Sequence, residues 1–198
     1  MNTNLFDALA ADETATLTRL RHRLAQDADT ADVLDIAYRT IETPVGTLLL
    51  AATTAGLVRV AYDVEGHDAV LAGLADRISP RVLRAPARLD SAARQIDEYF
   101  AKRRTAFEVP VDLRLAEGFR RNVIEHLRDI GYGRRESYAA VAAAIGHPRA
   151  VRAVGTACAH NPLPVVIPCH RVVRSDGSTG QYVGGPSAKS TLLNLEAA

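Results

Sequence analysis

The run Pro168-Cys169-His170-Arg171 holds the side chains best suited to chemistry in this 198-residue chain. Apolar residues precede it at 165–167 and follow it at 172–173, a pattern that predicts a short buried strand ending in a thiol and an imidazole. A thiol is a weak nucleophile until it becomes a thiolate, and a neighbouring histidine or arginine lowers its pKa. Cys169 is therefore a candidate nucleophile, although a lone cysteine is more often a small buried hydrophobe.

Several further motifs accompany this run in the second half of the chain. They are Ser137-Tyr138, the segment 149–155 (Arg-Ala-Val-Arg-Ala-Val-Gly), Asn161-Pro162, the segment 180–185 (Gly-Gln-Tyr-Val-Gly-Gly) and Glu196. In this order and spacing, with Ile167–Val172 as the central signature, they resemble the O6-alkylguanine-DNA alkyltransferases, also called methylated-DNA–protein-cysteine methyltransferases. The resemblance runs from about Phe119 to Glu196, and a weaker similarity reaches back to about Ile36.

The resemblance implies a one-step transfer of an alkyl group to the sulfur of Cys169 from O6-alkylguanine, or from O4-alkylthymine, in double-stranded DNA. The thioether would be permanent, so each molecule would act once, and no cofactor would be needed. His170 would take the thiol proton through a water molecule, and Glu196 would orient the imidazole. Asn161 would tie the helix-turn-helix to the active-site segment. The preference among alkyl groups and bases stays open.

The resemblance also implies which residues bind the minor groove of the DNA and which form the pocket for the damaged base. A base inside a duplex must be flipped out, at a cost of roughly a few kcal/mol, and Arg152 would fill the vacated stack. Tyr138 would crowd the 3′ phosphate and donate a proton to the departing guanine. The expected DNA contacts are Arg149, Ala150, Val151, Arg152, Ala153, Gly155 and Tyr138. The expected base pocket consists of Pro164, Val172, Tyr182, Val183, Gly184 and Cys158.

Short helices are predicted to position these groups in the C-terminal part. Apolar spacing predicts a helix over 119–130, and Ser137 is a good N-cap for a second helix over 138–145. Pro148 suits the first position of a third helix that runs to about His160. The last two would form a helix-turn-helix, although an ordinary helical hairpin is the commoner structure. A final helix is expected over 187–196.

The N-terminal part reads as a small β-meander with helices. Strands are predicted over 36–41, 47–52, 57–62 and 107–113, amphipathic helices over 67–78 and 89–103, and a helical extension with an acidic linker over 1–34. The resemblance implies a ribonuclease-H-like fold for this supporting part. We therefore expect an α+β protein with an extension over 1–34, a supporting domain over 35–113 and a DNA-binding alkyltransferase domain over 114–198.

Charge is unevenly distributed along the chain. Residues 1–113 hold 13 Lys and Arg against 17 Asp and Glu, whereas residues 114–198 hold 11 against 6. A basic C-terminal part fits a polyanionic partner such as DNA. Two cysteines are too few for a disulfide framework, and neither a secretory signal nor a membrane-length apolar run is present. We expect a cytoplasmic monomer without a membrane partner.

Three alternatives deserve comparison with this interpretation. Cys158, His160, Cys169 and His170 could form a metal site, but neighbours on an extended segment point to opposite faces. Zinc-binding relatives use N-terminal cysteines, and this chain has none before Cys158. A non-catalytic damage sensor would lack the nucleophile that this chain retains. A cysteine hydrolase would need an oxyanion-hole signature, and none is found beyond the bare turn.

Overall fold

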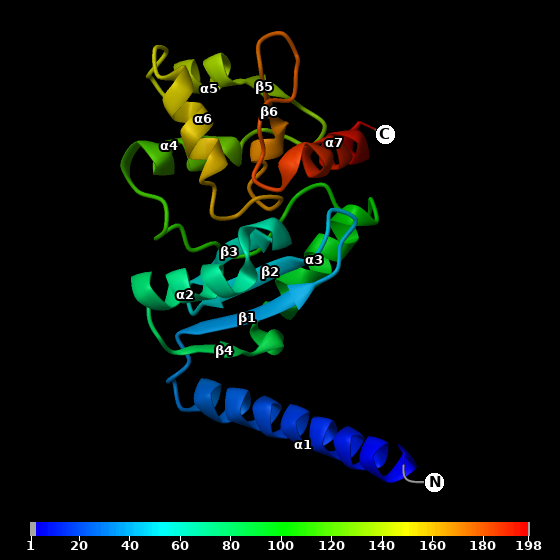
Figure 1. Ribbon diagram of the computed structural model, residues 1–198. Helices are drawn as coiled ribbons and strands as arrows, with labels where there is room; N and C mark the ends of the chain where they lie inside the picture. Colours follow the sequence, from blue (N-terminus) through cyan, green and yellow to red (C-terminus); the bar gives the residue numbers. More distant parts are fainter. Residues whose placement is uncertain (1–2, 198) are drawn as a thin grey trace.

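The protein is seen in a computed structural model that describes residues 3–197, with only the helical backbone described for residues 3–12 and 14. Three tiers are visible in Figure 1: C-terminal helices above, a β-sheet with its helices in the middle, and a long N-terminal helix below. This is the α+β architecture expected from the sequence, with a small sheet followed by a mainly helical part.

The sheet has the strand order β3-β2-β1-β4. β1 (Ile36–Ile41), β2 (Leu48–Thr53) and β3 (Gly56–Tyr62) form the predicted antiparallel meander. Successive side chains of a strand face opposite sides, and helices cover both sides here. Leu74 of α2 (His67–Arg77) packs with Ala51, whereas α3 (Asp90–Phe100) packs on the side of Leu48 and Leu50. Short 3-10 turns, η1 (Asp63–Glu65) and η2 (Pro86–Leu89), precede these two helices.

Two strand predictions in this part are corrected. No strand was predicted between the helices over 67–78 and 89–103, yet β4 (Val82–Arg84) pairs parallel with β1 at the sheet edge. The strand predicted over 107–113 is absent, since this stretch makes only one isolated bridge, between Val111 and Leu57. Pro110 lies inside it and has no N–H to donate, so a regular ladder cannot extend through the segment.

The C-terminal part contains the predicted helix-turn-helix. α4 (Gly118–Leu127) precedes α5 (Tyr138–Ala144) and α6 (Val151–Ala159), and α7 (Gly185–Glu196) closes the chain. Ser137 caps α5 as predicted, because its hydroxyl accepts from the Ala140 N–H at 3.0 Å. The start predicted for α6 at Pro148 is wrong. The Ala150 N–H bonds to the His147 carbonyl in a separate turn, and the helix begins after it.

The strand predicted before Cys169 is also wrong. Residues 164–166 form a turn, with Val165 at a φ of +71° and the Ile167 N–H bonded to the Leu163 carbonyl at 2.7 Å. Cys169 opens the 3-10 turn η3 (Cys169–Arg171), and only the two-residue strand β6 (Val172–Val173) follows, parallel to β5 (Glu136–Ser137). A buried apolar run does not by itself distinguish a strand from a turn inside a core.

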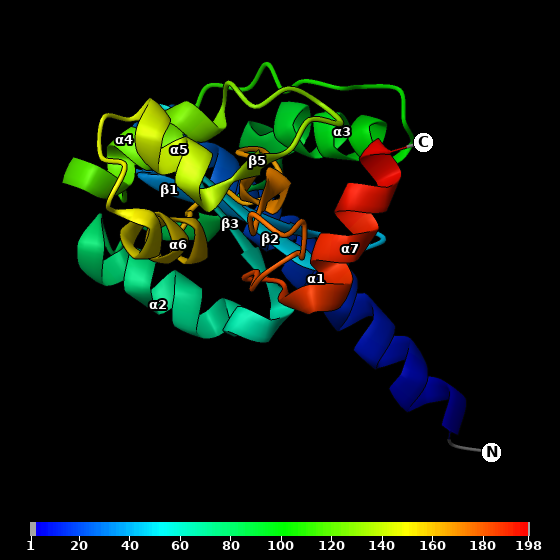
Figure 2. The same cartoon turned by 90° about the horizontal axis from the view of Figure 1, so that it is seen from above.

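α1 (Thr3–Thr30) lies within the helical extension predicted over 1–34 and projects from the body of the molecule, as Figure 2 shows. The acidic stretch expected as a linker begins inside this helix, where Asp29 forms an ion pair with Arg88. Leu17, Leu20 and Leu24 lie exposed on it. The helix is instead held by Ala25 and Ala28, which pack with Leu34, Ala37 and Ala85.

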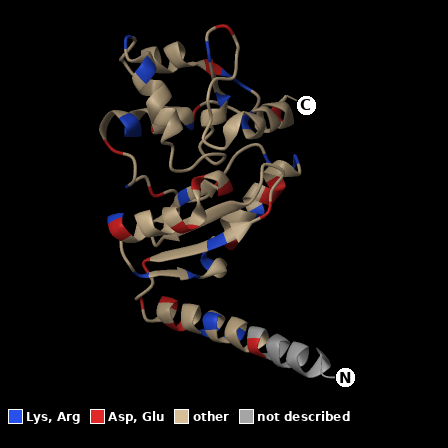
Figure 3. Ribbon diagram, viewed as in Figure 1, with Lys and Arg blue, Asp and Glu red and all other residues tan. Residues whose placement is uncertain are grey.

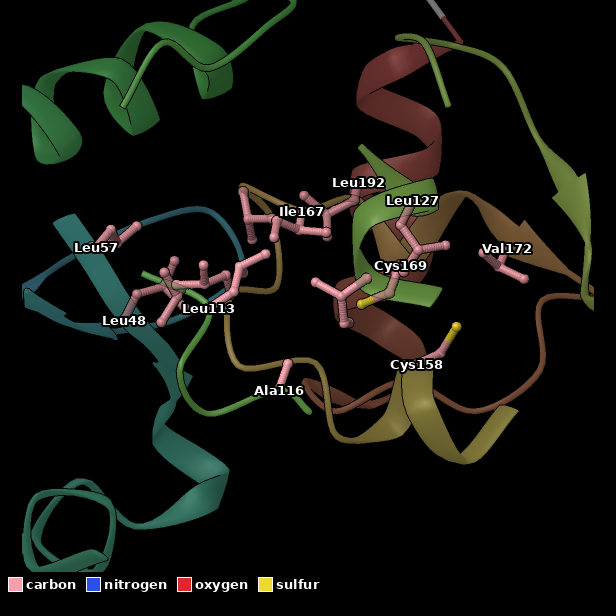
Figure 4. Packing of buried hydrophobic residues seen from close by; sticks show 14 of the residues in the cluster. Leu48, Leu57, Leu113, Ala116, Leu127, Cys158, Ile167, Cys169, Val172 and Leu192 are labelled. Carbon is pink, nitrogen blue, oxygen red and sulfur yellow. The ribbon is translucent and has the colours of Figure 1, made fainter. Parts of the chain in front are cut away.

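One hydrophobic core joins the sheet to the C-terminal helices. It includes Leu48 of β2, Leu127 of α4, Cys169 and Leu192 of α7, all shown in Figure 4. The candidate nucleophile is thus embedded where the two parts meet. Within the part of the chain that the structure describes, no helix is both long and apolar enough to cross a membrane.

Candidate active site

Cys169 lies in the core with only 2% of its surface exposed. The Asn161 side chain donates from Nδ2 to Sγ at 3.1 Å and to the Ile167 carbonyl at 2.8 Å, and its Oδ1 accepts from the Leu163 N–H. Asn161 therefore links the end of α6 to the turn that carries the thiol. Burial raises the pKa of the Cys169 thiol to about 11, although the Asn161 hydrogen bond and the charge of Lys189 oppose the rise. The resting group is a thiol, not a thiolate.

His170 follows Cys169 in the sequence, and its imidazole is completely buried. Its Nε2 lies 2.9 Å from Oε1 of Glu196. An ionised carboxylate only accepts, so the network assigns the proton to Nε2 and leaves Nδ1 as an acceptor. Nδ1 has no hydrogen-bond partner in the described chain. Burial lowers the pKa of His170, and the hydrogen bond and charge of Glu196 oppose this shift without cancelling it. His170 is thus a neutral base with an available lone pair.

Glu196 sits near the end of α7 and accepts hydrogen bonds from several directions. Tyr99 donates to Oε1 at 2.7 Å, the Gly133 N–H to Oε2 at 3.2 Å, and Arg171 through both Nε and Nη2 at 2.9 Å. Burial alone would raise the pKa of this carboxyl, but the hydrogen bonds from His170, Arg171 and Tyr99 outweigh it and hold the pKa well below its usual range.

Sequence reasoning missed two of these partners. Arg171 was expected to act beside the thiol, but its buried guanidinium pairs with Glu196 and donates to the Ile130 carbonyl. Tyr99 lies in the amphipathic helix predicted over 89–103, and no catalytic role was assigned to it. The Pro-Cys-His-Arg motif could have drawn attention to Arg171 as a residue of the site. No local sequence pattern connects Tyr99 with Glu196.

Tyr138 begins α5 and lies close to two glycines. An added Cβ at Gly180 would meet its hydroxyl at 3.1 Å, and one at Gly155 would stand 4.0 Å from the ring. Lys189, which sequence reasoning did not single out, is fully buried, donates to the Val172 carbonyl at 2.7 Å and lies 5.9 Å from the Tyr138 ring centroid. Burial raises the pKa of Tyr138 and lowers that of Lys189. A proton donor and a cation therefore stand near the thiol.

The residues expected to form the base pocket fall into two groups. Pro164, Val172 and Cys158 are buried in the core that holds Cys169. Tyr182, Val183 and Gly184 belong to the loop before α7. The Tyr182 hydroxyl lies 3.1 Å from that of Tyr62 on β3, and its ring meets His170 edge-on at 6.4 Å. A Cβ at Gly184 would stand 2.6 Å from the Tyr62 ring, so only glycine fits there. The loop is thus packed against the sheet.

The other residues expected to contact DNA, apart from Tyr138, lie on a different surface. Arg149, Val151, Arg152 and Ala153 are exposed, and Ala150 and Gly155 are half-buried, in and just before α6. The guanidiniums of Arg149 and Arg152 make no hydrogen bond or ion pair within the described residues. In Figure 3 the ribbon at this helical end of the molecule is blue at several Lys and Arg positions. Val154, Ala157 and Cys158 hold the other side of α6 in the core.

The metal-site alternative finds no support in the described chain. No three His, Cys, Asp or Glu side chains gather there as possible ligands. Cys169 and His170 lie in a 3-10 turn instead of the extended segment assumed above. His160 is exposed at the end of α6, where Nδ1 lies 2.8 Å from the Thr156 carbonyl.

Comparison with protein families gives two matches that together cover most of the chain. Residues 36–113 match the family described as "6-O-methylguanine DNA methyltransferase, ribonuclease-like domain". Residues 118–198 match "6-O-methylguanine DNA methyltransferase, DNA binding domain".

Individual relatives point to the same group of proteins. A methylated-DNA–protein-cysteine methyltransferase of Mycolicibacterium paratuberculosis is 38% identical over 81% of this chain and 92% of its own. The bifunctional transcriptional activator/DNA repair enzyme Ada of Escherichia coli is 35% identical over 94% of this chain and 51% of its own. The crystal structure of Mycobacterium tuberculosis OGT in complex with DNA is 36% identical, with a TM-score of 0.70 over 81% of this chain and 92% of that one.

Proposed function

The chain belongs to the 6-O-methylguanine DNA methyltransferase family, and on this basis we propose that it repairs DNA by moving the alkyl group of O6-alkylguanine irreversibly onto Cys169. The buried cluster around the thiol carries this proposal. Asn161 donates to Sγ at 3.1 Å, and the His170–Glu196 pair, 2.9 Å apart, lies in the same core. A nucleophile, a base and a group that orients the base are what thiol chemistry requires.

In the proposed reaction the Cys169 sulfur attacks the alkyl carbon as the bond from that carbon to O6 breaks. The thiol proton passes to Nδ1 of His170, through a water molecule, and Tyr138 protonates the departing guanine. The proton held by His170 then restores Tyr138, so the products are guanine and the S-alkylated protein. Glu196 stabilises the imidazolium that forms in between.

The raised pKa of Cys169 shapes this mechanism. A thiol with a pKa of about 11 is almost entirely protonated at neutral pH. Deprotonation must therefore accompany attack, with a neutral His170 ready to accept. This arrangement keeps the buried sulfur unreactive until a substrate is in place, and it differs from a thiolate held ready in advance.

DNA binding is proposed to use the surface of α6. The guanidiniums of Arg149 and Arg152 have no partner among the described residues, and small residues beside them allow a close approach to the minor groove. We propose that the damaged base is flipped into a pocket that Pro164, Cys158, Val172 and the loop 182–184 would line. Arg152 would take its place in the stack.

We also propose a division into an extension over 1–34, a supporting domain over 35–113 and a DNA-binding domain over 114–198, in a cytoplasmic monomer. The family matches over 36–113 and 118–198 support the two inner borders. The reaction needs no second copy, because every proposed catalytic group belongs to one chain.

Mass spectrometry tests the proposed function. The protein is incubated with a duplex carrying one O6-methylguanine, and its intact mass and peptides are measured. We expect a gain of one methyl group on the peptide that holds Cys169. An unchanged mass, or a methyl group on Cys158, would overturn the proposal.

A further inference from the structure

The hydroxyl of Tyr99 reaches from the sheet half of the molecule into the active site. Tyr99 lies on α3, is completely buried, and donates to Oε1 of Glu196 at 2.7 Å. The same oxygen lies 2.9 Å from Nε2 of His170. A residue of the supporting part thus shares one carboxylate oxygen with the proposed base.

The surroundings of Tyr99 fix this hydroxyl in place. Its ring packs against Phe100 and Phe107 with centroids 5.3 Å away and against Tyr132 at 6.1 Å. Burial and the negative charge of Glu196 raise the pKa of Tyr99 well above its usual range. The phenol therefore remains a proton donor throughout the pH range in which the protein works.

We propose that Tyr99 is a positioning residue for alkyl transfer, which acts through Glu196 to set the basicity of His170. This inference rests on the proposed function. A hydrogen bond donated to a carboxylate stabilises its negative charge and weakens its attraction for the imidazole proton. Tyr99 also fixes Oε1 opposite Nε2. The supporting half thereby tunes the base that must accept the thiol proton.

The sign of the effect follows from this arrangement. Without the Tyr99 hydroxyl, Oε1 keeps only Arg171 and His170 as donors among the described residues. It then attracts the imidazolium more strongly, so the pKa of His170 rises. The charges of Arg171 and Lys189, which lower this pKa, stay the same in the Tyr99 variant. Transfer requires neutral His170, so the acid limb of the pH–rate profile must move to higher pH. A hydrogen bond to a charged group contributes on the order of 1.5 to 3 kcal/mol, and only the part that differs between neutral and protonated His170 shifts the pKa of this imidazole. We therefore expect a shift of roughly half to one pH unit.

Tyr132 offers a matched control. Its hydroxyl donates to the carbonyl of Leu195 at 3.1 Å, one residue before Glu196. Tyr132 and Tyr99 therefore both anchor the end of α7, but the Tyr132 hydroxyl bonds to the backbone and leaves the carboxylate untouched. A purely structural role for Tyr99 would make the two Phe variants behave alike.

The test compares wild type, Tyr99→Phe and Tyr132→Phe. The pKa of the His170 ring is measured by NMR titration without DNA, and single-turnover methyl transfer is measured as a function of pH. We expect Tyr99→Phe to raise both the His170 pKa and the acid limb by about half to one pH unit, and Tyr132→Phe to leave both unchanged. Unchanged values in Tyr99→Phe, or equal shifts in both variants, would overturn the proposal.

Two further features keep the result decisive. The NMR titration does not need transfer. A wild-type protein that fails to transfer would therefore reject the proposed function, while the titration would still decide whether Tyr99 sets the pKa of His170. If Tyr99→Phe does not fold, 3-fluorotyrosine at position 99 retains the packing and makes the hydroxyl a stronger donor. The His170 pKa must then fall, and an unchanged or higher value would overturn the proposal.

Discussion

The two working surfaces of this protein are built in opposite ways. Around Cys169, the polar side chains of Asn161, His170 and Glu196 are buried and bonded to one another or to nearby groups. In and just before α6, Arg152 and Arg149 are exposed, and their guanidiniums have no partner in the described chain. Chemistry needs groups fixed in a medium of low dielectric constant, whereas DNA binding needs charges that an incoming phosphate can reach.

This contrast predicts a separation of effects. Changes in the buried network should impair transfer and stability while leaving DNA affinity nearly intact. Changes on α6 should weaken binding and base flipping while leaving the fold and the intrinsic chemistry intact. The experiments below test this separation from the largest expected effect to the smallest.

Cys169→Ser should abolish transfer completely. A serine hydroxyl does not replace a thiol as nucleophile in this site, and the change removes no contact to DNA. Intact-mass analysis after incubation with O6-methylguanine duplex measures the first effect, and a binding titration measures the second. Methyl transfer to Cys158 in this variant, or a large loss of DNA affinity, would break the comparison at its centre.

Glu196→Gln should slow single-turnover transfer by roughly tenfold or more, because the imidazolium of His170 loses its counter-charge. Thermal or denaturant unfolding should show a loss of about 3 kcal/mol, since Arg171 stays buried without its ionised partner.

Glu136→Gln is the matched control for that variant. Glu136 pairs with His126 at 2.9 Å in a partly exposed position, where ion pairs contribute little. Transfer and stability should stay close to wild type. A control that loses as much as Glu196→Gln would show that the buried position gives Glu196 no special role.

Alkaline pH should destabilise the wild type through Cys169. The folded thiol has a pKa of about 11 against an ordinary value of 9.0, so its contribution to folding is fully present below pH 9 and is lost as the pH rises towards 11. Denaturant unfolding at pH 8 and pH 11 should show that wild type loses roughly 2 to 3 kcal/mol more than Cys169→Ser. Equal losses of unfolding free energy in the two proteins would contradict a raised pKa of the Cys169 thiol.

Arg149→Ala should have the smallest effect. If this side chain neutralises one phosphate, the slope of log affinity against log salt should become shallower by about 0.9, with no change in transfer from free alkylguanine. Binding titrations across a salt series provide the measurement. An unaltered slope would show that Arg149 does not contact a DNA phosphate.

Local patterns in the sequence predicted much of the fold. Alternating residues marked β1, turn residues at 43–46 and 53–56 marked the bounds of β2 and β3, and Ser137 marked the start of α5. These signals depend on near neighbours. The turn at Val165 was mistaken for a strand, since burial within a shared core makes any apolar run look alike. The missing strand over 107–113 followed from Pro110, whose effect on pairing was overlooked.

The candidate site, like the fold, was predicted only where the signal was local in the sequence or belonged to the family motif. The family motif brought Cys169, Asn161, His170 and Glu196 into one hypothesis, and the structure pairs Asn161 with Cys169 and His170 with Glu196. Tyr99 could not be found this way. Its hydrogen bond to Glu196 spans 97 positions, and it exists only because the sheet half and α7 pack into one core.

The most direct test of the account compares two variants on two substrates. Single-turnover transfer is measured for Glu196→Gln and Arg152→Ala, with duplex DNA carrying O6-methylguanine and with free O6-alkylguanine. The account predicts that Glu196→Gln slows both reactions by a similar factor, whereas Arg152→Ala slows only the duplex reaction, by roughly tenfold or more. Equal losses on both substrates for Arg152→Ala, or a loss confined to the duplex for Glu196→Gln, would contradict the division between buried chemistry and exposed binding.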